Sequence, residues 1–129
     1  MTIHPGFARF ARQWAIRLTT YKRDGSPVGT PVNIAVDGDR AYFRTYEETW
    51  KFKRLTHNPE VEVAPSTIRG EPTGPAMHAH ARLLTGSEDE RAGSLIDAKH
   101  RLFQGLFVRF VHRIAGYHTR HFELTTADK

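Results

Sequence analysis

The feature that most constrains the fold is a series of short alternating segments between Trp14 and Leu84, each closed by a turn signal. In the first segment, apolar Ile16 and Leu18 alternate with polar residues, which is the period of a half-buried strand. The Lys-Arg-Asp-Gly sequence that follows predicts a hairpin turn. Because hairpin turns join neighbouring strands that run in opposite directions, this region predicts antiparallel pairing.

Further strands and helices follow from the same reasoning. The helical spacing of apolar residues predicts a helix after Gly105, and Ser87 with Glu90 matches a capping box at the start of another helix that runs to about Phe103. This order of elements favours a small barrel or another α+β fold over a parallel sheet. The further expected strands cover residues 28–36, 41–45, 61–64, 77–84 and 117–124, with a loop rich in glycine and proline over 65–75.

Length and composition limit the class of protein. The chain has 129 residues, and we take 1–129 as one domain. No apolar run approaches the ~18 residues of a membrane span, and the N-terminus lacks the pattern of a secretory signal. The absence of cysteine excludes disulfides and thiolate metal sites and favours a cytoplasmic location. The net charge of +5 and the sequence pI of about 9.9 favour an anionic partner.

The segment 45–59 predicts a short basic helix. It ends before Pro59, because the residue that precedes a proline avoids the helical region. Phe52 and Leu55 share one face of this helix, which anchors it to the core, and Lys51 lies on the flank. The opposite face carries Trp50, Lys53, Arg54 and His57.

A phosphate site is one interpretation of this helix. Either Thr45, with Glu48 as a capping box, or Thr49 alone caps its N-terminus. Free backbone N–H groups and the positive end of the helix dipole then join the cations Arg44, Lys51 and Arg54. A solvated basic surface helix explains the same residues, and for this segment alone it is the better interpretation.

The strand over 28–36 has one face of small residues, namely Gly29, Pro31, Asn33 and Ala35. A flat tricyclic ring needs a strand face without bulky side chains, together with backbone groups that reach its polar edge. Close packing against a helix or a second subunit explains the same residues. Both alternatives stay open at this point.

Metal and nucleic-acid sites receive less support. His78, His80 and Arg82 share a strand face, and alternate histidines can ligate a metal, but no spaced third ligand completes the set. We therefore predict no metal site. Neither a P-loop nor a dinucleotide fingerprint is present, and the dispersed basic charge lacks an RNA-binding motif, so we predict no nucleic-acid partner and no membrane partner.

Two long stretches carry a family resemblance: TTYKRDGSPVGTPVNIAVDGDRAYFRT and KFKRLTHNPEVEVAPSTIRGEPTGPAMHAHARLL. They resemble the PPOX-class F420-dependent oxidoreductases of the flavin and deazaflavin split β-barrel superfamily, which is related to pyridoxamine 5'-phosphate oxidase. The resemblance covers about residues 14–84. It rests on the order of D-G-x-P before a T-P-V strand, then R-T, K-x-x-R-L-x-x-N-P and R-G-x-P-T-G-P.

The resemblance implies a mainly β, six-stranded antiparallel split β-barrel with flanking helices. It also implies a homodimer with the cofactor in a groove at the subunit interface. Trp50 departs from the family, which often has a small residue there, and we expect its ring to cover the cofactor or narrow the groove. The implied cofactor-binding residues are Thr30, Pro31, Val32 and Asn33 along the ring, Arg44, Thr45, Thr49, Lys51 and Arg54 around the phosphate, and Pro65, Ser66 and Arg69 closing that end.

The activity implied by the resemblance is that of an F420H2-dependent reductase, which transfers a hydride from the deazaflavin to an unsaturated small molecule. Two alternatives remain: an FMN-dependent oxidoreductase or flavin carrier of the same fold, and a non-enzymatic module that binds a cofactor or tetrapyrrole. No side chain stands out as an obligatory acid, and we name no catalytic residue.

Overall fold

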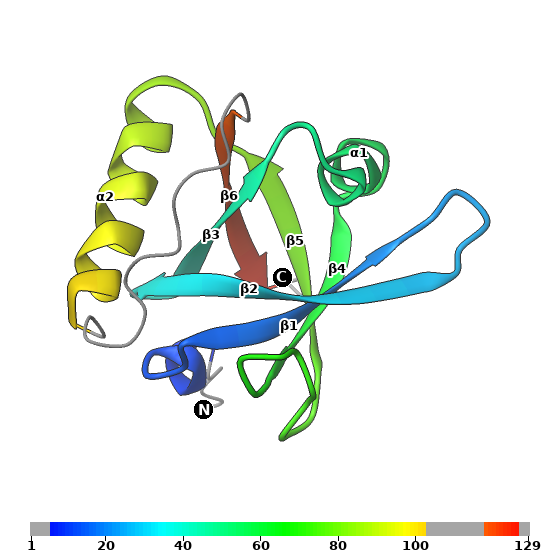
Figure 1. The fold of residues 1–129 in the computed structure, drawn as a ribbon, viewed down its shortest axis with the longest axis horizontal. Coiled ribbons are helices and arrows are strands. Elements are labelled where there is room, and N and C mark those ends of the chain that lie inside the picture. The colour runs from blue at the N-terminus through cyan, green and yellow to red at the C-terminus, as the bar shows by residue number, and fades with distance from the viewer. Residues whose placement is uncertain (1–5, 103–117, 127–129) are drawn as a thin grey trace.

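Six antiparallel strands form a closed barrel in the computed structural model, which describes residues 6–102 and 118–126 (Figure 1). The strand order around the barrel is β1-β2-β3-β6-β5-β4. The predicted six-stranded antiparallel barrel with flanking helices is therefore confirmed. The strands are β1 (Ala15–Tyr21), β2 (Pro27–Asp37), β3 (Arg40–Tyr46), β4 (Glu60–Pro65), β5 (Met77–Leu83) and β6 (Thr119–Thr126), and the helices are η1 (Ala8–Phe10), α1 (Trp50–His57) and α2 (Gly86–Leu102).

The bounds of the strands lie within two residues of the predicted ones, and the helices differ more. Helix α1 covers only Trp50–His57 of the predicted segment 45–59, because residues 45 and 46 belong to β3. Helix α2 begins at Gly86, so Ser87 lies within its first turn and not at the predicted cap position. Strand β6 continues to Thr126, two residues past the predicted end at 124. The helix predicted after Gly105 lies outside the described residues.

The barrel core is built from the inward-facing residues of the strands and is centred on aromatic contacts. The rings of Phe43 and Phe122 stack with centroids 5.2 Å apart, and Phe52 from α1 meets Phe122 edge-on at 5.9 Å. Phe43 and Phe122 are almost completely buried. The apolar face predicted for α1 is thus the face that attaches the helix to the barrel.

Helix α2 covers the outer surface of β2 and β3 (Figure 1). Its buried residues Ala92 and Ile96 pack with Ala35 and Tyr42 in a second apolar cluster outside the barrel. The small residue Ala35 therefore has a packing role beneath a helix, which is one of the two explanations that the sequence left open. None of the helices in the described ranges has the length and apolar character needed to cross a bilayer.

The β1–β2 hairpin extends beyond the barrel and runs alongside α1 (Figure 1). Strand β2 is long enough to serve two neighbours: residues 27–33 pair with β1, and residues 34–37 pair with β3. At the tip, Gly25 adopts a φ of 90°, a conformation that is costly for residues with a side chain. The hairpin and α1 therefore face each other across a gap at this side of the barrel.

Replacement of Phe122 by alanine tests the core assignment. Because Phe122 is almost completely buried between Phe43 and Phe52, we expect F122A to lower the free energy of unfolding by about 3–5 kcal/mol. The matched aromatic control is W50A, whose side chain is 73% exposed and whose loss should change stability by less than about 0.5 kcal/mol. Urea unfolding followed by circular dichroism measures both, and equal effects of the two substitutions would contradict the assignment.

Candidate functional site

Helix α1 begins at a side-chain cap supplied by Thr49. The Thr49 Oγ1 accepts a hydrogen bond from the Phe52 backbone N–H at 3.2 Å and donates one to the Tyr46 carbonyl at 2.8 Å. Of the two capping residues that the sequence allowed, the structure thus uses Thr49. Thr45 lies in β3 and is only 4% exposed, so its hydroxyl points into the protein interior.

The N-terminal end of α1 retains its positive polarity. No acidic residue lies in the first turn, and within the described part of the chain no partner is found for the backbone N–H groups of Trp50 and Lys51. The two glutamates just before the helix have other partners: Glu47 pairs with Arg120 of β6 at 2.9 Å, and Glu48 pairs with His118, just before β6, at 2.6 Å. This end of the helix is therefore available to an external anion.

Lys51 and Arg54 add two side-chain cations to this end of the helix. Burial, with a contribution from the nearby Arg54 charge, lowers the pKa of Lys51 to about 8. The Arg54 Nε donates to the Thr20 hydroxyl at 2.7 Å, which fixes the guanidinium over β1. Across residues 6–102 and 118–126, no carboxylate pairs with Lys51. A partly buried ammonium without a counterion has a net cost that a bound anion removes.

We call this group the α1 anion site: the Thr49 cap, the free N–H groups of Trp50 and Lys51, and the Lys51 and Arg54 side chains. Thr49, Lys51 and Arg54 were all expected around a phosphate. The structure brings these three together on one short helix.

Arg44 lies apart from the α1 anion site. Its Nε donates to His121 Nε2 at 3.1 Å, and its Nη2 reaches Asp97 on α2 at 2.9 Å. Because the Nε2 of His121 accepts this hydrogen bond, the ring proton lies on Nδ1. The Nδ1–H donates to the Asp89 Oδ1 at 2.9 Å. Arg44 is thus part of a polar network that attaches α2 to the sheet.

The small-residue face of β2 is covered in part by the chain itself. The Arg17 guanidinium lies where a Cβ on Gly29 would project, 2.4 Å from that position, and it donates to the Gly70 carbonyl at 2.9 Å. Gly70 in turn approaches Pro31 so closely that an added Cβ would lie 3.0 Å from the proline ring. Gly29 and Gly70 therefore permit close packing of this loop against the strand.

The other residues expected along a cofactor ring differ in accessibility. Val32 is 6% exposed and belongs to the barrel core, so only its backbone can face a ligand. Thr30 is half-buried on the same inward-facing side of β2. Asn33 projects outward and donates to the Trp14 carbonyl at 3.0 Å. Lining of a ring by residues 30–33 stays a prediction.

The loop after β4 holds the last group of expected site residues. Pro65 ends β4, and Ser66 is nearly buried, with its backbone N–H donating to Gln13 at 3.2 Å. Arg69 is exposed, and its backbone N–H donates to the Thr67 hydroxyl at 3.2 Å. This loop packs on β2 through Gly70, and its role at a cofactor stays a prediction.

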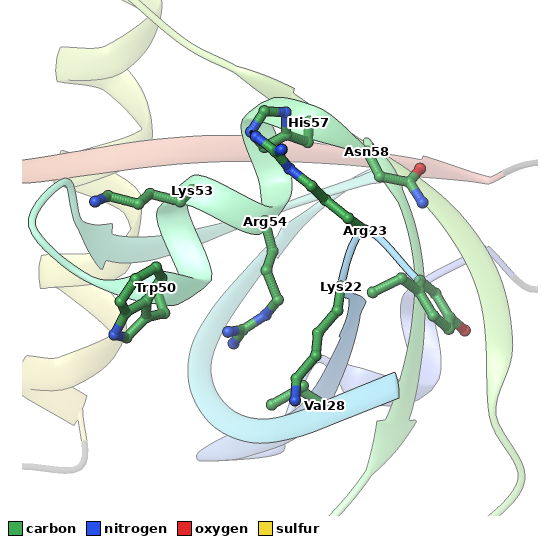
Figure 2. A pocket seen from close by; sticks show the side chains of 9 residues that line it. Lys22, Arg23, Val28, Trp50, Lys53, Arg54, His57 and Asn58 are labelled. Atoms are coloured by element: carbon green, nitrogen blue, oxygen red, sulfur yellow. The ribbon is translucent and has the colours of Figure 1, made fainter. Parts of the chain in front are cut away.

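A groove of about 990 Å³ separates α1 from the β1–β2 hairpin (Figure 2). We call it the hairpin groove. Trp50 stands at its edge, 73% exposed, with the Lys53 Nζ 4.8 Å from the ring centroid. Its lining comprises Tyr21, Lys22, Arg23, Val28, Trp50, Lys53, Arg54, His57 and Asn58.

Of these lining residues, the sequence predicts only Trp50 and Arg54 at a cofactor site. The sequence predicts Lys22 and Arg23 as part of a hairpin turn, and it does not indicate the direction in which the hairpin extends. Lys53 and His57 were correctly placed on the outer face of the helix, and that face now forms one wall of the groove.

One cluster of potential metal ligands is present in the described residues. Ligand atoms of Glu47, Glu48 and His118 lie within 4.8 Å of one another. Each carboxylate already has a cationic or hydrogen-bonding partner, because Arg120 pairs with Glu47 and His118 donates to Glu48 through its backbone N–H at 2.9 Å as well as its ring. Glu48 raises the pKa of His118. Ion pairing thus accounts for this cluster.

The histidines of β5 also have acidic neighbours. His80 lies 3.3 Å from Glu60, and His78 lies 3.7 Å from Glu62, both across the β4–β5 pair. These cross-strand pairs agree with a solvated sheet face.

Residues 7–119 match the Pyridoxamine 5'-phosphate oxidase family. Because this match spans most of the chain and the barrel has the corresponding architecture, the protein belongs to that family. The resemblance drawn from the sequence is therefore confirmed at the level of the family and the split-barrel fold. No curated protein matches the sequence significantly.

Solved structures similar to this chain differ in their reported roles. A putative 5-nitroimidazole antibiotic resistance protein from Bacteroides thetaiotaomicron aligns with a TM-score of 0.68 and 12% identity, covering 95% of this chain and 78% of its own. The heme storage protein HutZ from Vibrio cholerae aligns at 0.64 and 15%, covering 100% and 93%. An F420 reductase aligns at 0.61 and 16%, covering 96% and 94%. At these identities the likeness shows the fold alone.

The lowered pKa of Lys51 predicts how stability depends on pH. In the unfolded chain this pKa is ~10.4, whereas in the folded protein it is about 8. Below pH 8 the folded state therefore bears the cost of a buried charge, and that cost disappears as the pH rises from 8 toward ~10.4. We therefore expect the unfolding free energy of the wild type to rise between pH 7 and pH 9.5. Relative to K51M, which lacks this group, the rise should be on the order of 1 kcal/mol.

Urea titrations at the two pH values measure this difference. The pKa of Lys99 is also lowered to about 8 by burial, but Lys99 is present in both proteins and cancels. K53M is the control, because the Lys53 side chain is exposed on the same helix and its loss removes no buried charge. A pH-independent difference between the wild type and K51M would show that the Lys51 ammonium is not desolvated.

Proposed function

We propose that this protein is an F420H2-dependent reductase that holds the phosphate of its cofactor at the α1 anion site. The observation that carries the proposal is the partly buried Lys51 ammonium, which lies beside Arg54 and has no carboxylate partner in the described structure. A phosphodiester or phosphate supplies the missing negative charge. The free N–H groups at the start of α1 supply hydrogen bonds to its oxygens.

The residues of the site fit a phosphate better than a metal or a neutral ligand. The site contains donors and cations, and the nearby acids Glu47 and Glu48 are held by Arg120 and His118. Thr49 fixes the first turn of the helix, so the N–H groups are oriented before a ligand arrives. Phe52 and Leu55 fix the other face in the core, which keeps the cations at a set position relative to the barrel.

Reduced F420, when bound, supplies a hydride to an electron-poor double bond of a small molecule. The protein contributes binding and orientation. We extend the proposal to residues 30–33 as the segment that lines the ring, to a homodimer with the cofactor at its interface, and to the cytoplasm as the location. These points rest on the family resemblance and are supported by the family membership.

FMN is the alternative cofactor. It carries a phosphate that the same cations would bind, so the α1 anion site alone does not separate the two. A third alternative is a non-enzymatic module that binds a tetrapyrrole. The similarity of the fold to that of a heme storage protein is the reason to test it. Direct titration with the three compounds distinguishes these functions.

The decisive binding experiment compares F420, FMN and hemin on the purified protein. We expect F420 to bind with a Kd below about 1 μM and FMN and hemin to bind at least tenfold more weakly. K51A and R54A should each weaken F420 binding by roughly 10- to 100-fold, because each removes a charge-assisted contact to the phosphate. R91A is the charge-matched control, since Arg91 lies on α2 and pairs with Asp37 at 2.7 Å. Figure 1 shows α2 and α1 on opposite sides of the barrel.

The order of affinities determines the function. Tighter FMN or hemin binding would replace the F420 proposal with the corresponding alternative. Wild-type affinity in K51A and R54A would remove the α1 anion site as the phosphate site. Oxidation of bound F420H2 by a panel of electron-poor alkenes and heteroaromatic compounds then tests the reductase activity, and a complete lack of turnover would leave a carrier as the better function.

The same site predicts a pH dependence of cofactor binding. The pKa of Lys51 in the free protein is about 8, and phosphate binding favours the protonated form. The affinity for F420 should therefore be constant below pH 7 and fall as the pH rises above 8. K51A should lack this decline, which fluorescence titrations between pH 6 and pH 9.5 measure. A decline that persists unchanged in K51A would assign the titration to another group.

A further inference from the structure

The hairpin groove is a second cationic feature, formed by two elements that face each other (Figure 2). Lys22 and Arg23 come from the hairpin tip, and Lys53 and Arg54 come from α1. None of the described residues that line the groove is acidic. Four like charges around one cavity repel one another, and a ligand with several negative charges relieves that repulsion.

Trp50 gives the groove an aromatic edge. Its side chain is 73% exposed, and among the described residues only Ile68 is another large hydrophobic side chain with such exposure. Lys53 occupies a position 4.8 Å from the ring centroid, which adds positive charge beside the indole. An exposed indole beside cations can stack on a planar ring that carries anionic groups.

The size and shape of the groove favour a compact ligand. The Arg23 Nη2 lies 3.2 Å from His57 Nε2, so the hairpin and the C-terminal end of α1 are joined across the groove (Figure 2). The volume of about 990 Å³ is at the upper end of the range typical of small-molecule pockets. A long nucleic-acid strand would need a continuous channel, and the Arg23–His57 contact spans the groove at the C-terminal end of α1.

We infer that the hairpin groove binds a nucleoside di- or triphosphate, with the polyphosphate between Lys22, Arg23 and Arg54 and the base stacked on Trp50. Lys22 and Arg23 supply charge from one wall, and Arg54, fixed by its bond to Thr20, supplies it from the other. The inference goes beyond the proposed function. The groove shares Arg54 with the α1 anion site, but Lys51 does not line the groove, and neither Lys22 nor Arg23 belongs to the α1 anion site.

The test is a titration of the full chain with ADP and ATP, followed by calorimetry and by quenching of tryptophan fluorescence. The chain has two tryptophans, so W50F identifies the quenched residue as Trp50 and not Trp14. We expect R23A and K22A to weaken ATP binding about tenfold each, and W50F to abolish the quenching. R91A is again the charge-matched control with wild-type affinity. Melting curves confirm that each variant is folded.

Component ligands separate the two halves of the site. Inorganic triphosphate should bind about tenfold more weakly than ATP and without quenching, and adenosine should bind negligibly. Equal binding of triphosphate and ATP would overturn the stacking role of Trp50. No binding of ATP at millimolar concentration, or wild-type ATP affinity in R23A and K22A, would overturn the whole inference. A single-stranded oligonucleotide that binds more tightly than ATP would assign the groove to nucleic acid.

Failure of this inference is distinguishable from failure of the proposed function. ATP should bind to K51A as it does to the wild type, and F420 should bind to R23A and K22A as it does to the wild type. Because Arg54 belongs to both sites, ATP and F420 should weaken each other's binding, and the selective effects of K22A, R23A and K51A distinguish the two ligands. A loss of F420 affinity in R23A or K22A as large as the loss of ATP affinity would contradict a groove with a ligand of its own.

Discussion

The contact between Phe43 and Phe122 is the interaction on which the rest of the structure depends. Their stacked rings join β3 to β6 inside the barrel, and the edge of Phe122 receives Phe52 from α1. This contact therefore does two things. It fills the centre of the core, and it fixes the short helix whose polar side carries the cations. An eight-residue helix has little stability by itself, so its position is determined by this tertiary packing.

The electrostatics of α1 follow from that position. Because Phe52 and Leu55 pack in the core, the helical period places Trp50, Lys53, Arg54 and His57 on the face toward the hairpin groove. Arg54 also donates to Thr20 of β1, and Lys51 lies partly buried beside it. One short helix thus contributes to two basic surfaces, the α1 anion site and the hairpin groove, with Arg54 common to both. Acidic residues next to the helix do not neutralise either surface, because Glu47 and Glu48 are paired on the β6 side.

The fold could be predicted from the sequence because alternation and turn chemistry are local properties. The alternation of Ile16 and Leu18 with polar residues predicts a strand, and the sequence around Gly25 predicts a turn. Neither prediction requires knowledge of the neighbouring strands. The helix faces were also predictable, and Thr49 was one of two candidate caps. Family membership required the order of several weak motifs, since each by itself is of low specificity.

The arrangement of the site could be predicted only in part, because side-chain partners depend on distant elements. Arg44 was expected beside a phosphate, but α2 brings Asp97 and β6 brings His121 to it. The sequence left open whether the small face of β2 packs against the protein or lines a ring, and Arg17 and Gly70 cover part of it. Likewise, Lys22 and Arg23 line a groove because the hairpin lies next to α1, and the sequence does not predict that position.

The central claim is that Lys51 forms a buried, positively charged contact with the phosphate of a cofactor. The most direct measurement is the pKa of Lys51 by nuclear magnetic resonance, with ¹³C-labelled lysine and K51A for assignment, in the free protein and in the presence of saturating F420. The account predicts a pKa of about 8 in the free protein and a clear rise when F420 binds. A Lys51 pKa that does not change on F420 binding would contradict it.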